Sequence, residues 1–73
     1  MNEKVPIFFN YNGKEFTGQF DPVFGAGGNV WYLMINKYYM GRLRLNDEGW
    51  FFDGNKFTEM ADYFGEYLTL WYE

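Results

Sequence analysis

Residues 55–73 read NKFTEMADYFGEYLTLWYE, and this stretch decides the fold. It is the one window in which apolar residues recur at steps of three and four, the spacing of one helical face. The members of that face are Phe57, Met60, Ala61, Phe64, Leu68 and Trp71. We therefore predict a helix over residues 56–72, with Asn55 or Thr58 as its side-chain cap and Gly65 on or beside its exposed face. Everything before it has the pattern of short strands and turns, which need such an apolar cover.

Length and composition predict a single domain over residues 1–73. The chain has no cysteine and no histidine, which excludes disulfides and metal sites built on thiolates or imidazoles. Aromatic residues make up 26 % of the chain, and their large rings compensate for a core limited by small size. We predict no bound cofactor and no metal.

The first hairpin is predicted over strands 5–10 and 14–20. Asn12-Gly13 between them is typical of a two-residue turn in which both residues need positive φ. This turn pairs Phe9 with Phe16, and alternation then places one set of side chains in the core. That set is Val5, Ile7, Phe9, Phe16, Gly18 and Phe20, with Phe8 on the opposite, outer face.

Strands over 30–36, 39–45 and 50–53 complete the predicted sheet. The loop between the first two of these strands is either Asn36-Lys37 or Asn36 to Tyr39, and both have an even number of residues. Either loop places one alternating set in the core: Val30, Tyr32, Met34, Gly41, Leu43 and Leu45. Trp50 and Phe52 also point inward. The predicted fold is α+β, a five-stranded antiparallel meander with one C-terminal helix packed on one face. A sheet curled toward a half-open barrel is the alternative, because short strands twist strongly.

The connection over residues 21–29 contains the glycine cluster Gly25-Ala26-Gly27-Gly28. A phosphate-binding glycine loop follows a strand and opens a helix, whereas here the next residues have a strand pattern. We therefore interpret this segment as a flexible connection.

The most unusual predicted feature is an apolar outer face on the sheet. Its members are Phe8, Trp31, Leu33, Ile35, Met40, Arg42, Arg44 and Phe51. One helix cannot cover both faces of a sheet, and an exposed apolar patch of this size is typical of an interaction site. We expect a small non-enzymatic interaction module that forms a homodimer or binds a protein or peptide partner. The alternative is that the N-terminus, the 21–29 loop or closure of the sheet covers this face.

Two other functions are weaker alternatives. Single-stranded nucleic acid could stack on Trp31, Tyr38 and Tyr39 beside Arg42 and Arg44, but the net charge of −4 disfavours phosphate binding. A carboxylate-based enzyme would use Asp47, Glu48 and Asp53, and a calcium site would add Asn46 and Asn55. These residues fit turns for backbone reasons, and their spacing matches no calcium loop.

The distribution of charge separates the two ends of the chain. Residues 1–46 carry five Lys/Arg and three Asp/Glu, whereas residues 47–73 carry one Lys and seven Asp/Glu. We interpret the acidic outer face of the helix as a solvated surface, with docking of a basic partner as the alternative. We see no signal peptide and no run of the ~20 apolar residues that a membrane span needs, so we expect a cytoplasmic protein.

Overall fold

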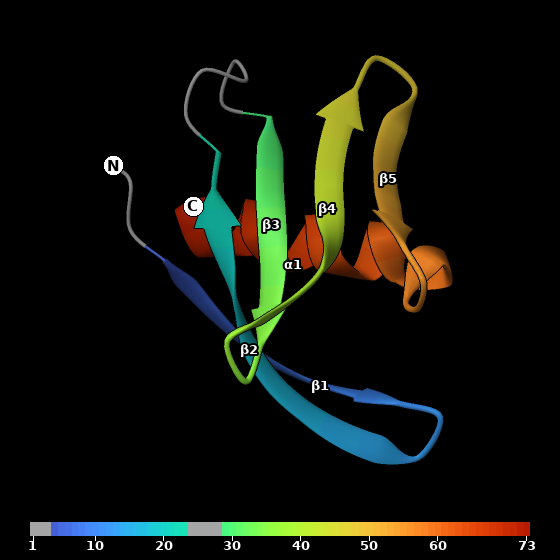
Figure 1. Ribbon diagram of the computed structural model, residues 1–73. Coiled ribbons are helices and arrows are strands. Elements are labelled where there is room, and N and C mark those ends of the chain that lie inside the picture. The colour runs from blue at the N-terminus through green and yellow to red at the C-terminus, as the bar shows by residue number, and fades with distance from the viewer. Residues whose placement is uncertain (1–3, 24–28) are drawn as a thin grey trace.

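The computed structural model describes residues 4–23 and 29–73 of the chain. Its five strands form one antiparallel sheet in chain order: β1 (Val5–Tyr11), β2 (Lys14–Pro22), β3 (Val30–Ile35), β4 (Tyr38–Asn46) and β5 (Gly49–Gly54). A single 3-10 turn, η1 (Thr58–Met60), leads into the C-terminal helix α1 (Ala61–Tyr72). The sheet curls into a half-barrel and α1 runs across its strands on one side (Figure 1). The predicted α+β fold is thus confirmed, in its curled form.

The first hairpin follows its turn residues. Asn12 and Gly13 have φ of 52° and 80°, the positive values that a two-residue turn of this type requires. The predicted register is confirmed, because Phe9 lies opposite Phe16 and Val5 opposite Phe20. Val5, Phe9 and Phe20 are buried, while Phe8 faces outward. A local turn signal therefore determines which side of β1 enters the core.

Phe64 of α1 lies at the centre of the core and has no exposed surface. Its ring centroid is 5.1 Å from that of Phe9, 5.4 Å from Phe20 and 5.5 Å from Phe52. All three pairs meet edge to face, the arrangement that aromatic quadrupoles favour. The helix is therefore held to strands from both halves of the sheet through one ring.

The start of the helix differs from the prediction. Neither Asn55 nor Thr58 provides a side-chain cap, and Phe57 precedes η1 in the left-handed conformation, with φ of 69°. The Phe57 ring is fully buried, 5.3 Å from the centroids of both Phe9 and Phe16. Burial of this ring, rather than a capping hydrogen bond, thus sets where the chain turns into the helix.

Gly65 and Trp71 also differ from their predicted places. Gly65 is buried against the indole ring of Trp50, whereas Trp71 is 43 % exposed. Leu70 and Tyr72 are exposed as well, so the last turn of α1 passes beyond the core. The buried face of the helix is therefore shifted toward Gly65 and ends at Leu68.

The predicted orientation of β3 is wrong, because β4 contains a β-bulge. The turn at Asn36-Lys37 pairs Met34 with Tyr39, yet the next pair is Leu33 with Gly41, so Met40 is an extra residue in β4. A bulge of this kind shifts every later pair by one residue, and a one-residue shift exchanges the faces. Trp31, Leu33 and Ile35 are consequently buried in the core, and Tyr32 faces outward.

The connection predicted over residues 21–29 begins later than expected, because Asp21 and Pro22 extend β2 by pairing with Tyr32 and Trp31 of β3. Residues 24–28 of that connection lie outside the described part of the chain. On either side of them, the Val23 backbone N–H donates to the carbonyl oxygen of Val30 at 3.0 Å. Across residues 4–23 and 29–73, we find no helix with the length and apolar character that a membrane crossing requires.

Candidate interaction surface

The structure separates the eight residues that were predicted to share the outer face. Trp31, Leu33 and Ile35 are 8 %, 0 % and 7 % exposed and belong to the core, so their predicted place on the surface is wrong. Met40 is partly buried and packs against the same core. The other four, Phe8, Arg42, Arg44 and Phe51, do face outward. Phe8 stands apart from the rest on the edge strand β1.

A compact set of side chains from β3, β4 and β5 occupies the outer face where the aliphatic residues were expected. We call it the tyrosine–arginine face, and it consists of Tyr32, Tyr39, Arg42, Arg44, Phe51 and Asp53. Tyr32 lies opposite Arg42, which lies opposite Asp53 on the next strand. Arg44 lies opposite Phe51 in the same way. Cross-strand neighbours interact directly in a sheet, so the register itself assembles this face.

Asp53 holds the two arginines in place. Its Oδ2 accepts hydrogen bonds from Arg44 Nε at 2.7 Å and from Arg42 Nη2 at 3.2 Å. The hydrogen bond from Arg44 is the main cause that lowers the pKa of the Asp53 carboxyl below its ordinary value, and the bond from Arg42 adds to it. The guanidinium carbon of Arg44 also lies 5.3 Å from the centre of the Phe51 ring, a cation–π contact. The arginines are thereby ordered while their side chains stay 37–48 % exposed.

Two tyrosines complete the face: Tyr39, which the sequence analysis named only as a base-stacking residue, and Tyr32, which it missed. Tyr32 and Tyr39 are 39 % and 58 % exposed, and their rings meet edge to face at 5.2 Å. Tyr32 had been predicted to point into the core. A comparison of the two alternating sets of β3 could have shown this. The set with Tyr32 contains a hydroxyl group, whereas Trp31, Leu33 and Ile35 have none and suit a core better.

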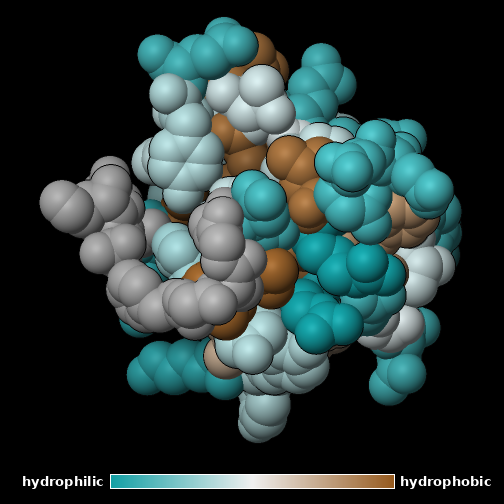
Figure 2. Space-filling model, turned by 90° about the horizontal axis from the view of Figure 1, so that it is seen from above, coloured by the Kyte–Doolittle hydropathy of each residue, from teal (hydrophilic) through white to brown (hydrophobic). Residues whose placement is uncertain are grey.

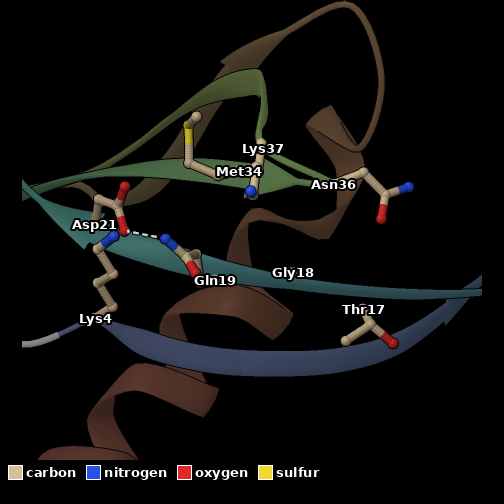
Figure 3. Close-up of a pocket in the computed structure, with 8 residues that line it drawn as sticks. All are labelled: Lys4, Thr17, Gly18, Gln19, Asp21, Met34, Asn36 and Lys37. Carbon is tan, nitrogen blue, oxygen red and sulfur yellow. Dashed lines mark hydrogen bonds between the residues drawn. The ribbon is translucent and has the colours of Figure 1, made fainter.

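A hollow of about 470 Å³ lies at the junction of β2 with the β3–β4 turn. Side chains of Lys4, Gln19, Asp21, Met34 and Lys37 surround it (Figure 3). Gln19 Nε2 donates to Asp21 Oδ1 at 2.8 Å, which fixes one wall. The two lysines can attract a carboxylate or phosphate group. Asp21 offsets one of these charges, however, and both lysines are exposed.

The opposite end of the sheet holds the β4–β5 turn and lies away from this hollow. Seen from that end, hydrophobic residues appear as separate areas among hydrophilic ones (Figure 2). In the β4–β5 turn, the Glu48 backbone N–H donates to Asn46 Oδ1 at 2.8 Å, so Asn46 serves the turn itself. Within the described residues, no group of three or more acidic side chains is placed to hold a metal ion. The exposed rings on the outer face of the sheet are therefore the better candidate surface.

In comparisons with known proteins, the chain matches no family model, no curated protein and no solved structure. The candidate site rests on the geometry and chemistry described above.

Proposed function

We propose that the chain is a small non-enzymatic interaction module that binds a protein or peptide, including a second copy of itself, through the tyrosine–arginine face. The observation that carries this proposal is the pair of exposed tyrosine rings beside two arginines already ordered by Asp53. Tyrosine and arginine are enriched at binding hot spots because each offers a large contact area together with hydrogen-bonding groups. Side chains that are ordered before binding lose less entropy in the complex.

Catalysis receives less support than binding. Asp53 is the carboxylate of this face, and its lowered pKa and two arginine partners keep it ionised rather than ready to donate a proton. The chain has no cysteine or histidine to act as nucleophile or base.

The proposal can be tested with the double variant Tyr39→Ser/Arg42→Ser. Both side chains are exposed, so the fold should survive. A matched control, Tyr72→Ser/Lys14→Ser, removes one exposed tyrosine and one exposed cation away from this face. Self-association is measured by sedimentation velocity, and peptide binding by selection from a displayed library. We expect the face variant to lose associations that the wild type and the control share. A face variant that keeps all of them would overturn the proposal.

Single-stranded nucleic acid is a second candidate, favoured by the proximity of Tyr32 and Tyr39 to Arg42. The predicted stacking residues were Trp31, Tyr38 and Tyr39, and of these Trp31 is buried and unavailable for stacking. The net charge of −4 also opposes phosphate binding. Titration with a labelled oligonucleotide at two salt concentrations tests it, because each neutralised phosphate contributes a slope of about −0.7 in log K against log salt. A flat response or no binding excludes this candidate.

A further inference from the structure

We propose that α1 carries a second docking site, distinct from the tyrosine–arginine face, which binds an arginine side chain of a basic partner protein. The site is a hollow of about 230 Å³ between Tyr63, Glu66, Tyr67 and Leu70. Counted from Tyr63, the other three positions follow at three, four and seven residues, the spacing that gathers side chains on one side of a helix. The hollow thus combines two aromatic rings, an aliphatic side chain and a carboxylate.

The ring of Tyr67 is held in position before any partner arrives. Its hydroxyl group donates a hydrogen bond to the backbone carbonyl oxygen of Pro6 on the edge strand β1. The same ring stacks on Trp71, with ring centroids 6.4 Å apart and planes inclined by 27°. Tyr63 is placed by contact with Phe64 of the core, at a centroid distance of 6.1 Å. Fixed rings reduce the entropy that binding would otherwise cost.

The charge on this side of the helix specifies a cationic occupant. Residues 58–73 contain Glu59, Asp62, Glu66 and Glu73 and no lysine or arginine. Asp62 and Glu66 are four residues apart, a spacing at which like charges repel across one helical turn. The helix therefore keeps an unfavourable pair that a bound cation would relieve.

Arginine fits the hollow better than other cations. Its planar guanidinium group can stack on a tyrosine ring and at the same time donate two hydrogen bonds to one carboxylate, here that of Glu66. Its aliphatic stem can lie along Leu70, which is 62 % exposed and has little other cover. Tyr63 is 49 % exposed, so the ring face is accessible from solvent.

The test uses three short peptides that differ only in carrying arginine, lysine or glutamine at the same positions. Binding is followed by NMR through the ring signals of Tyr63 and Tyr67. We expect the arginine peptide to shift these signals and to bind at least ~10-fold more tightly than the glutamine peptide, with lysine between them. Ring signals that do not move, or a lysine peptide that binds as tightly as arginine, would overturn the assignment.

Variants separate a local site from a general electrostatic attraction. Tyr63→Ser and Glu66→Gln should each weaken binding of the arginine peptide by about 5-fold or more. Glu48→Gln removes the same charge in the β4–β5 turn and should leave binding unchanged. Equal losses in Glu66→Gln and Glu48→Gln would reduce the effect to long-range attraction and refute the site. The variant Tyr39→Ser/Arg42→Ser should keep its affinity, so this site and the tyrosine–arginine face can fail independently.

Discussion

Replacing Gly65 by alanine should destabilise the protein, although the same change stabilises most helices. A Cβ at this position would lie 2.3 Å from Cγ and Cδ2 of Trp50, whereas ordinary contacts begin at 3.4 Å. The indole ring would have to move by about 1 Å. Because its centroid lies 5.5 Å from that of the Trp31 ring, the strain would spread into the core. Overpacking of this kind costs about 1–3 kcal/mol. The gain in helix propensity returns about 1 kcal/mol.

The expected net loss is therefore up to ~2 kcal/mol, a fall of up to roughly 15 °C in the unfolding midpoint of a domain this small. Thermal unfolding followed by circular dichroism measures it. The matched background is Trp50→Leu, which removes the indole ring. There, Gly65→Ala should be neutral or should stabilise by up to about 1 kcal/mol. If Gly65→Ala raises the midpoint in the wild-type background, the packing of Trp50 on this glycine is refuted.

Three further predictions follow from burial and charge. Phe64→Ala should cost about 3–5 kcal/mol, comparable to the whole stability of a small domain, and a cooperative variant with an unchanged midpoint would contradict the core described here. Leu33→Glu should unfold the chain because it buries an unpaired carboxylate, whereas Tyr32→Glu on the opposite face should leave the circular dichroism spectrum unchanged. The reverse result would show that Leu33 faces outward and Tyr32 inward, as the sequence alone predicts. The Asp53 carboxyl has a lowered pKa, chiefly through Arg44, so its contribution to stability is present above its ordinary pKa of 3.8 and is lost as the pH falls through the lowered value. The difference in unfolding free energy between wild type and Asp53→Asn should accordingly be constant at neutral pH and shrink in acid, as denaturant titrations can establish.

Local chemistry made the first hairpin predictable. Asn12-Gly13 can adopt the positive φ values of a two-residue turn, and a turn of known length leaves one register for β1 and β2. The alternating pattern then assigned Phe9 and Phe16 to the core without reference to the rest of the chain. The apolar spacing of the C-terminal segment likewise predicted the burial of Phe64.

The start of the helix was not predictable from the same kind of signal. Asn55 and Thr58 are both good capping residues, yet the chain enters the helix through a left-handed Phe57. That conformation is costly for a bulky side chain, and the fully buried ring compensates through contacts with strands far away in the sequence. The glycine at position 65 was equally unpredictable, because the close approach of the Trp50 ring, rather than helix propensity, requires a residue without a Cβ there. Tertiary packing decided both positions.

The bulge at Met40 explains why the predicted surface had the wrong chemistry. With the two-residue turn at Asn36-Lys37 and no extra residue, Trp31 would lie opposite Arg42, and cross-strand partners share a face. Either the arginine would then enter the core or the tryptophan would leave it. One additional residue in β4 resolves the conflict, because it places Trp31 opposite Leu43 inside and Tyr32 opposite Arg42 outside. β3 can then bury Trp31, while β4 buries Leu43 and still exposes its two arginines. The tyrosine–arginine face is thus a direct consequence of the same irregularity that completes the core.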